Sequence, residues 1–473
     1  NRRTLTKNSE IAIVGMGPTG TTLANLLANR GISVSIFEKQ ETTYPLPRAV
    51  HFDGEVMRVF QSIGLASEIS EHSLVNKGML FKDINSNIII DWSRSQAIGP
   101  MGWYESYRFH QPDLENTLRR GLSRFKNVKI NYDSEIKKIS DNGNDVTIEL
   151  SSGKTHTSKF LVGCDGAQSI VRKFLQQDLV DLGFKQRWLV IDTILNTDIP
   201  HLGDHTVQIC DPINPMTYVR GTGKRRRWEM RLVDDTISEI TPKFVWEKLS
   251  NWISEKDAQI ERSAVYTFKS AISKKWSKGN VFLAGDAAHL MPPFMGQGMC
   301  AGIRDVSNLA WKLSTVINGA DRKILNTYTT ERLANVQEFI DLTVRLGKII
   351  NQTVKGKKEA TKMDSIWPSL GPGLGPRTNL EGKLAPQFIS NDSYKADDLS
   401  PTGSYTLEVS NERVLSGCKE WLNKNEIKAA IVRPDFYILK INSERNSPEN
   451  LNSSFQQFYN NLLGLLPSRK FVG

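Results

Sequence analysis

Three glycines near the start of the chain, spaced as Gly15-x-Gly17-x-x-Gly20, are the residues whose types and spacing are best suited to chemistry. An apolar run precedes them, helically spaced leucines follow, and a second apolar run ends in Glu38. In such a strand–turn–helix–strand unit, the first glycine permits the turn, the second lets the backbone approach a pyrophosphate, and the third lets helix and strand pack closely. An acid about twenty residues further on accepts hydrogen bonds from a ribose. The pattern predicts a dinucleotide site; an ordinary glycine-rich turn is the alternative.

A second glycine-rich segment covers residues 278–313. It has Asp286 at the end of a short apolar strand, a stiffening proline pair at 292–293, and glycines at 296 and 298 that open a helix. The N-terminus of such a helix presents free backbone N–H groups and the positive end of a dipole. It would stabilise negative charge on a bound ligand without a titratable group. A capped core helix after a proline-rich loop is the alternative.

A third segment, residues 160–172, is an apolar strand followed by the turn Asp165-Gly166 and by a helix start that carries Arg172. This arrangement also suits a phosphate-bearing ligand. A plain surface turn is the alternative interpretation of the Asp-Gly pair taken alone.

Together and in this order, the three segments resemble the fingerprints of the class A flavoprotein monooxygenases, the single-component aromatic hydroxylases. The resemblance covers roughly residues 8 to 350. Residues 294–305, 227–229 and 433–437 are most similar to the branch that includes 3-(3-hydroxyphenyl)propionate hydroxylase. One departure is the pair Met299-Cys300, where several relatives have an asparagine, so a flavin contact made by that amide is lost or replaced by backbone.

The resemblance implies an α/β fold with a glutathione-reductase-like FAD-binding domain, a β-sheet substrate domain and a C-terminal thioredoxin-like domain. Sequence patterns divide the chain accordingly, because strands and helices alternate first, strands and turns follow from Trp188 to Phe268, and helices return over 302–352. The expected divisions are 8–180 for the first part of the FAD-binding domain with an inserted sheet element at 79–107, 181–275 for the substrate domain, 276–353 for the second part with its helices, 354–395 for a linker and 396–473 for the tail.

The tail is expected to contain a helix over 412–423, two short strands within 429–439 that meet at a proline turn, and an amphipathic final helix over 451–465. It has no paired cysteines, so a packing or dimerisation role is favoured over redox chemistry.

The activity that the resemblance implies is NAD(P)H-dependent hydroxylation of a phenolic or other aromatic substrate by FAD and O₂, through a flavin C4a-hydroperoxide. NADPH and NADH both remain open as reductant. Two alternatives are a flavoprotein oxidase and a tailoring monooxygenase that modifies a larger polyketide-like phenol, for example an antibiotic. A halogenase is disfavoured because a W-x-W-x-I-P type motif is missing. A non-catalytic flavin-binding protein is the alternative from a different class.

Site residues follow from the same comparison. Arg48 resembles the family arginine that faces both the FAD and the nicotinamide donor, and Gln111 resembles the glutamine that touches FAD. His289 either borders the flavin or makes a structural hydrogen bond. The expected catalytic residues are Arg48, His289, Pro293 and Phe294, and the expected substrate contacts are Gln208, Tyr218 and Phe294. The expected FAD contacts are Gly15, Gly17, Pro18, Thr19, Gly20, Glu38, Lys39, Arg48, Gln111, Asp165, Gly166, Gly285, Asp286, Pro293, Gly296, Gln297, Gly298 and Met299; no metal ligands are expected.

The amino-acid composition limits the kinds of ligand and partner that we expect for this protein. The chain has 473 residues and a formal charge of +10, which favours anionic ligands, but its basic residues are dispersed. The densest run, residues 224–227, lies beside two glycines and reads as a hairpin turn rather than a nucleic-acid surface. Four separated cysteines indicate neither a disulfide framework nor a zinc site. We therefore expect a cytoplasmic enzyme, monomer or homodimer, that acts on a small aromatic substrate such as a phenolic acid, without nucleic acid or membrane partners.

Overall fold

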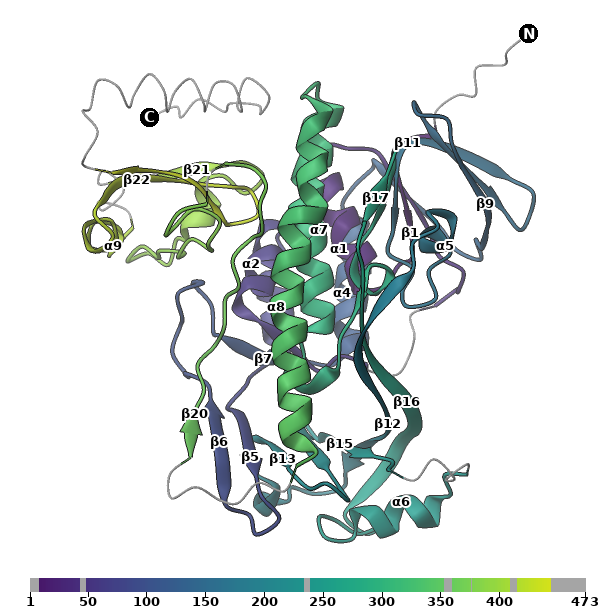
Figure 1. The fold of residues 1–473 in the computed structure, drawn as a ribbon, viewed down its shortest axis with the longest axis vertical. Helices are drawn as coiled ribbons and strands as arrows, with labels where there is room; N and C mark the ends of the chain where they lie inside the picture. Colours follow the sequence, from purple (N-terminus) through teal and green to yellow (C-terminus); the bar gives the residue numbers. More distant parts are fainter. Residues whose placement is uncertain are drawn as a thin grey trace.

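The computed structural model describes residues 8–42, 48–233, 239–352, 360–375, 377–408 and 415–443. Two large sheets and a layer of helices make up most of these residues (Figure 1). The α/β fold class expected from the sequence is confirmed. In the described ranges, no helix combines the length and the hydropathy that a bilayer span requires.

The first large sheet has the strand order β17-β18-β11-β1-β2-β8, with β9 and β10 attached beside β11. Its central strands β1, β2, β8, β11 and β18 are parallel. Helices pack on this sheet, and its central strands are almost fully buried, which explains their nearly continuous apolar sequences. The strands of this sheet are β1 (Ser9–Val14), β2 (Val34–Phe37), β8 (Val128–Asn131), β9 (Ile136–Asp141), β10 (Val146–Leu150), β11 (Thr155–Gly163), β17 (Ser277–Lys278) and β18 (Val281–Leu283).

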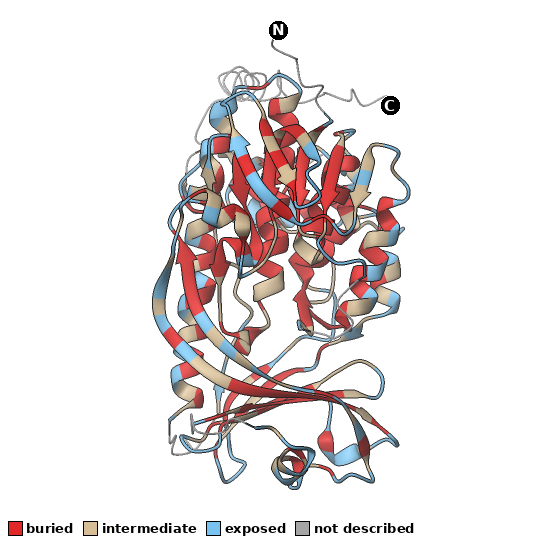
Figure 2. Cartoon of the chain, turned by 90° about the vertical axis from the view of Figure 1, so that its right-hand side faces the viewer, coloured by how far each residue is buried: buried red, intermediate tan, exposed pale blue. Residues whose placement is uncertain are grey.

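The second large sheet has the order β19-β16-β12-β15-β14-β13-β5-β6-β20 and lies at the opposite end of the molecule (Figure 1). Two long paired strands, β12 and β16, curve from the region of the first sheet into the second (Figure 2). The strands are β5 (Gly78–Lys82), β6 (Ile88–Ser93), β12 (Leu179–Leu195), β13 (Thr206–Ile209), β14 (Met216–Arg220), β15 (Arg225–Arg231), β16 (Ala258–Ser273), β19 (His289–Leu290) and β20 (Thr361–Lys362). The strands predicted between Trp188 and Phe268 are therefore present. The predicted hairpin is also present, with Lys224 in its turn and residues 225–227 at the start of its second strand.

The segment 79–107 differs from a self-contained insertion. Its strands β5 and β6 extend the second large sheet, because β5 pairs in parallel with β13. Its last part enters a small sheet in which β7 (Ser106–Arg108) lies between β3 (His51–Asp53) and β4 (Leu74–Val75). The segment thus links the two halves of the molecule instead of forming a separate element.

Helices α7 and α8 run side by side, and the lower end of α8 reaches the second large sheet (Figure 1). Helix α7 begins at Gly298, where the sequence predicts it, and α8 fills the remainder of the predicted helical region. The α-helices are α1 (Pro18–Ala28), α2 (Gly54–Ser62), α3 (Ala66–Glu71), α4 (Gln111–Leu122), α5 (Ile170–Phe174), α6 (Pro242–Leu249), α7 (Gly298–Ile317), α8 (Thr327–Ile350) and α9 (Cys418–Lys424).

The described part of the tail is an antiparallel sheet of β21 (Tyr405–Glu408), β22 (Ile427–Val432) and β23 (Ile438–Ser443), with α9 packed against it. The two predicted strands within 429–439 are confirmed. The helix predicted over 412–423 begins instead at Cys418; residues 412–414 lie outside the described residues, as does the predicted helix over 451–465.

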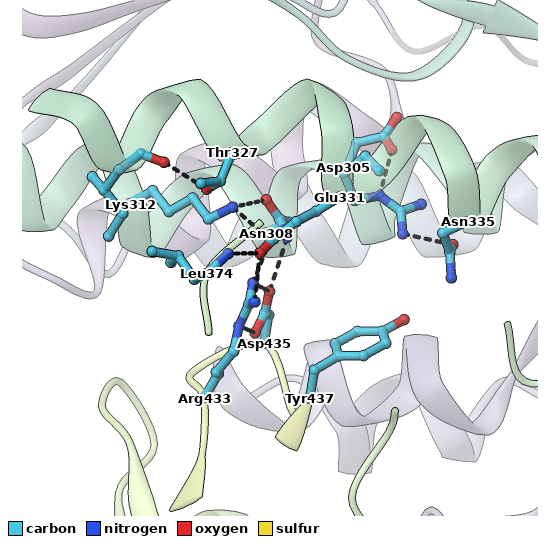
Figure 3. A network of polar contacts seen from close by, with 12 residues as sticks. Asp305, Asn308, Lys312, Thr327, Glu331, Asn335, Leu374, Arg433, Asp435 and Tyr437 are labelled. Atoms are coloured by element: carbon cyan, nitrogen blue, oxygen red, sulfur yellow. Dashed lines mark hydrogen bonds and ion pairs between the residues drawn. The ribbon is translucent and has the colours of Figure 1, made fainter. Parts of the chain in front are cut away.

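Buried charges attach this tail to the helices. The guanidinium of Arg58 on α2 binds Asp397 at 2.7 Å. On the other side, Glu331 of α8 accepts hydrogen bonds from Lys312 and Arg433 at 2.7 and 2.8 Å, and all three side chains are essentially inaccessible to solvent (Figure 3). The tail and the helical layer therefore form one packed body.

Candidate active site

A cavity of about 360 Å³ lies between the glycine-rich loop, the start of α7 and the inner face of the second large sheet. Its cofactor-side lining includes Gly17, Pro18, Thr19, Arg48, Gln111, Gly166, Asp286, Pro293, Gly296, Gly298 and Met299. Three segments that are far apart in the sequence therefore converge on one space, together with the sheet.

The glycine-rich loop has the shape that a pyrophosphate requires. A Cβ atom on Gly15 would overlap the carbonyl oxygen of Cys164, and one on Gly20 would overlap the carbonyl oxygen of Gly15. A Cβ on Gly17 would meet nothing within 4 Å, and no side chain caps the N-terminus of α1. The N–H groups at this helix start face an open approach, so these residues fit the FAD pyrophosphate.

Glu38 lies beside this loop but not in the cavity lining. Its Oε2 accepts a hydrogen bond from the backbone of Met16 at 2.8 Å, and its Oε1 accepts one from Gln40 at 3.0 Å. The guanidinium of Arg119 donates to the Met16 carbonyl at 3.0 Å, a contact with no signal in the sequence pattern. Glu38 thus holds the loop in place, and Lys39 is exposed. Ribose binding by Glu38 stays a prediction.

Two acids from the fingerprints are placed differently. Asp286 lines the cavity, as expected of a flavin contact. Asp165 does not, because its carboxylate accepts hydrogen bonds from Ser169 and from the Ile170 backbone at the start of α5. Its neighbour Gly166 does reach the cavity. The structure therefore gives Asp165 a role in fixing the turn that presents Gly166.

Gln111 and Arg48 are in direct contact, although 63 positions separate them. The Gln111 Oε1 accepts hydrogen bonds from the backbone N–H groups of Arg48 and Ala49 at 3.0 and 2.7 Å. The carbonyl of Arg48 accepts one from Arg227 at 2.7 Å. Both predicted residues line the cavity, and Gln111 positions the backbone from which the exposed Arg48 side chain projects.

His289 is outside the cavity lining. It is 1% exposed, and its Nε2 lies 2.6 Å from Oδ2 of Asp305. The same Oδ2 accepts a hydrogen bond from the Gly285 backbone, and the other oxygen of Asp305, Oδ1, accepts one from Arg332. Of the two alternatives for this histidine, the structure supports the structural hydrogen bond. Gly285 is likewise behind the lining, in the turn that ends β18.

The loop before α7 contributes residues to the cavity wall and a residue that supports this wall from behind. Pro293 and Phe294 line the cavity, and the centroid of the Phe294 ring lies 5.4 Å from that of the Trp188 ring. Gln297 is buried behind it, where its amide oxygen accepts a hydrogen bond from Arg304 at 2.9 Å. No side chain caps the N-terminus of α7, so its first N–H groups remain available at the cavity.

Two expected substrate contacts are not in the lining. Tyr218 points to the other face of the sheet, where it stacks on Trp252 and donates a hydrogen bond to the Gly203 carbonyl at 3.2 Å. Strand alternation explains this, because its neighbours Thr217 and Val219 face the cavity. Gln208 is fully buried beside Thr217, and its amide donates hydrogen bonds to the backbone of strands β13 and β14.

The sequence interpretation missed the charged residues of the sheet. Asp192 binds Arg227 and Arg262 at 2.7 Å each, and Glu229 lies 3.6 Å from Arg227. Burial raises the pKa of Glu229. The alternation of Arg227, Trp228 and Glu229 is the signal that could have placed the two charged side chains on one face. His51, Arg94 and Arg108 also line the cavity, together with apolar residues Met79, Trp92, Val190, Val219 and Phe268.

Comparison with known proteins gives consistent relatives. Residues 8–343 match the family described as FAD binding domain. A probable NADH-specific resorcinol 4-hydroxylase from Rhodococcus jostii is 32% identical over 91% of this chain and 92% of its own length. A 3-(3-hydroxy-phenyl)propionate/3-hydroxycinnamic acid hydroxylase from Mycolicibacterium smegmatis is 35% identical over 76% of this chain, which spans 64% of that relative.

Solved structures share the fold. The flavin-dependent monooxygenase PieE, crystallised with FAD and substrate, superposes with a TM-score of 0.79 at 16% identity, covering 97% of this chain and 99% of its own. The p-nitrophenol 4-monooxygenase PnpA from Pseudomonas putida has a TM-score of 0.67 at 22% identity, over 74% and 91% of the two chains. With the convergence of the three fingerprints on one cavity, these matches lead to one conclusion: the chain belongs to the FAD-binding-domain family, as a class A flavoprotein monooxygenase.

Proposed function

We propose that this protein is an FAD-dependent monooxygenase that hydroxylates a phenolic compound with NADH or NADPH and O₂. The observation that carries the proposal is the cavity itself, in which a pyrophosphate-binding loop and the open N-terminus of α7 face a partly apolar sheet surface. When bound, reduced FAD supplies the activation of O₂ that delivers one oxygen atom to an electron-rich ring. The relatives named above carry out hydroxylations of phenols by their printed names.

The residues of the chain then bind and orient the cofactor and the phenol, and they exclude water from the reacting groups. The N–H groups at Gly298 and Met299 stabilise negative charge at the edge of the cavity, and Arg48 provides a cation beside it. Phe294 and Phe268 form aromatic walls with Trp188 behind them, which keep water from the reacting ring. No group of three or more His, Cys, Asp or Glu side chains suited to a metal ion occurs in the described ranges.

The same proposal includes the finer organisation of the molecule. It assigns residues 8–180 and 276–353 to FAD binding, 181–275 to the substrate side, 354–395 to a linker and 396–473 to a thioredoxin-like tail. Support comes from the sheet membership of the strands, with the difference that β5 and β6 belong to the substrate side. A cytoplasmic location is part of this proposal.

The test is oxygen incorporation by the FAD-loaded enzyme. Resorcinol and 3-(3-hydroxyphenyl)propionate are supplied in turn with NADH, then NADPH, under ¹⁸O₂, with a reaction lacking the phenol as control. The expected product is heavier than its substrate by one labelled oxygen atom. Label found only in hydrogen peroxide or water, for every phenol that stimulates NAD(P)H consumption, would replace the hydroxylase with an oxidase.

A further inference from the structure

Two arginines, Arg94 and Arg108, lie on the cavity wall where the small sheet meets the second large sheet. Arg108 is the last residue of β7, and Arg94 follows the end of β6. Both line the cavity, and Arg108 is only 7% exposed. Two positive charges are thus held close to each other in a partly enclosed space.

Their hydrogen bonds leave capacity for a ligand. Arg108 donates through Nη2 to the hydroxyl of Thr206, while its buried Nε has no hydrogen-bond partner among the described residues. Arg94 donates to the hydroxyl of Ser365, which in turn donates to Glu105 at 2.9 Å. Within the described ranges, neither guanidinium forms an ion pair within 4.0 Å; Glu105 and Asp53 act on Arg94, and Glu229 acts on Arg108, only from a greater distance.

Two other arginines of this cavity wall form ion pairs with carboxylates. Arg227 and Arg262 share the buried carboxylate of Asp192, and Glu229 stands next to Arg227. That cluster carries its own counter-charges. Burial and the charge of Arg94 lower the pKa of Arg108 to about 10, although the charge of Glu229 opposes this. Burial lowers the pKa of Arg94 to about 10 against the charges of Glu105 and Asp53, so both arginines remain charged at neutral pH.

A buried guanidinium that lacks an anion is costly, because its desolvation is not offset by an ion pair. Its planar N–H groups match the two oxygens of a carboxylate. Beside the pair lie the apolar side chains of Met79 and Trp92, and the Arg94 guanidinium stacks 4.2 Å from the Trp92 ring centroid. The space therefore suits a molecule with an aromatic ring at one end and an anionic group at the other.

We propose that Arg94 and Arg108 bind the carboxylate of an aromatic acid, which makes the substrate of this enzyme a phenol with an anionic side chain. This inference rests on the proposed function, and it separates two kinds of substrate named for the relatives: resorcinol has no carboxylate, whereas hydroxyphenylpropionate has one. The pyrophosphate groups of FAD and of the nicotinamide donor are other anions, and the experiment distinguishes them from the substrate.

The experiment measures binding to the oxidised FAD-loaded enzyme without turnover. Dissociation constants of 3-(3-hydroxyphenyl)propionate and of its neutral amide are obtained from the change in flavin absorbance. We compare the unchanged protein with Arg108→Met, Arg94→Met and the charge-conserving Arg108→Lys; Arg345→Met, an exposed position on α8, is the matched control.

The expected result is that the acid binds about 10- to 100-fold more tightly than the amide, since the contact is a charge-assisted hydrogen bond. Each Met variant loses that preference, Arg108→Lys retains part of it, and Arg345→Met leaves it unchanged. FAD content and, in a separate steady-state assay, the Michaelis constant for NADH stay the same in all variants. Folding is checked by thermal unfolding, where Arg108→Met is expected to raise the midpoint because it removes a buried charge without an acid partner.

Equal binding of acid and amide by the unchanged protein would overturn the inference, as would a Met variant that weakens FAD or NADH instead of the acid. The two proposals fail separately. If resorcinol takes up labelled oxygen but the acid has no advantage, the hydroxylase stands and the carboxylate site falls. If the acid is preferred but no phenol is oxygenated, the binding site remains and the proposed reaction falls.

Discussion

The phenolic hydroxyl of Tyr437 donates a hydrogen bond of 2.9 Å to Oε1 of Glu55, which precedes it by 382 positions. The other oxygen of Glu55 accepts a hydrogen bond from Arg304 at 2.6 Å, and Arg304 also donates to Gln297, the residue before α7. A short chain of buried contacts therefore joins the tail to the helix start that faces the cavity.

Tyr437→Phe removes one of these contacts and leaves the ring. We expect the free energy of unfolding to fall by about 1–2 kcal/mol, because the buried Glu55 carboxylate loses a donor. Urea unfolding followed by tryptophan fluorescence measures it. Tyr394→Phe, at a residue that is 38% exposed, is the control and should change little. An unchanged unfolding energy for Tyr437→Phe would show that the contact adds nothing.

Glu331→Gln tests the buried network of Figure 3. Glu331 faces Lys312, Arg377 and Arg433, so neutralising it leaves Lys312 in the interior without an ion-pair partner among the described residues and leaves Arg433 with Asp435 alone. We expect a loss of about 3–5 kcal/mol in the free energy of unfolding. Glu338→Gln changes an exposed residue of the same helix and should cost little. Similar losses in the two variants would contradict the network's role.

Gly20→Ala and Gly17→Ala separate folding from cofactor binding. A Cβ on residue 20 would overlap the Gly15 carbonyl, so this variant should lose both stability and FAD. A Cβ on residue 17 meets open space in the protein, so that variant should fold normally and lose FAD affinity only. Circular dichroism and the ratio of flavin to protein absorbance give the two readings. Full FAD content in Gly17→Ala would place the pyrophosphate elsewhere.

His51 should make the protein sensitive to acid. Burial and the nearby charges of Arg108 and Arg94 lower its pKa to about 3, against the favourable charge of Asp53. In the unfolded chain the pKa of His51 is about 6.5, so between about pH 3 and pH 6.5 the unfolded chain binds a proton that the native protein does not. Stability therefore falls as the pH drops, with a contribution from His51 of about 1.4 kcal/mol per pH unit.

The measurement is the free energy of unfolding between pH 6 and pH 4. His51→Asn should reduce its slope by that contribution, while His72→Asn, at an exposed residue, serves as the comparison. Identical slopes in the His51 variant and the unchanged protein would mean that His51 titrates normally.

Arg48→Ala tests the residue that the family resemblance assigns to the cofactor and the nicotinamide donor. Loss of a charge-assisted contact of about 1.5–3 kcal/mol should slow flavin reduction by tenfold or more while FAD stays bound. Stopped-flow absorbance measures the reduction, and Arg345→Ala is the control for loss of an exposed arginine. Reduction of the Arg48 variant at the unchanged rate would reject the assignment.

Local patterns predicted most of the cofactor side. Close approaches to backbone carbonyls require glycine at positions 15 and 20, and a left-handed φ of 64° favours it at position 296, where a Cβ would also meet the His51 side chain. The substrate side depends on side-chain direction and on pairing between distant strands. Thr217 and Tyr218 both suit a strand, so composition alone does not say which one faces the cavity.

Two further features had no local signal. The parallel pairing of β5 with β13 brings together strands that are far apart in the chain, so the sequence of β5 does not reveal its sheet. Arg94 and Arg108 are of a residue type that is usually exposed, and only the packing of two sheets turns them inward.

The order in which the strands pair constrains how the protein is made. Strand β11 pairs with β1, which is synthesised before it, and with β18, which is synthesised after it. Strand β6 pairs with β20 only when Thr361 has been synthesised. Unpaired strand edges are templates for association with other chains. On the ribosome, the nascent chain therefore exposes the edge of β11 until residues 281–283 have been made and the edge of β6 until residues 361–362 have been made, so chaperones that cover these edges should raise its folding yield.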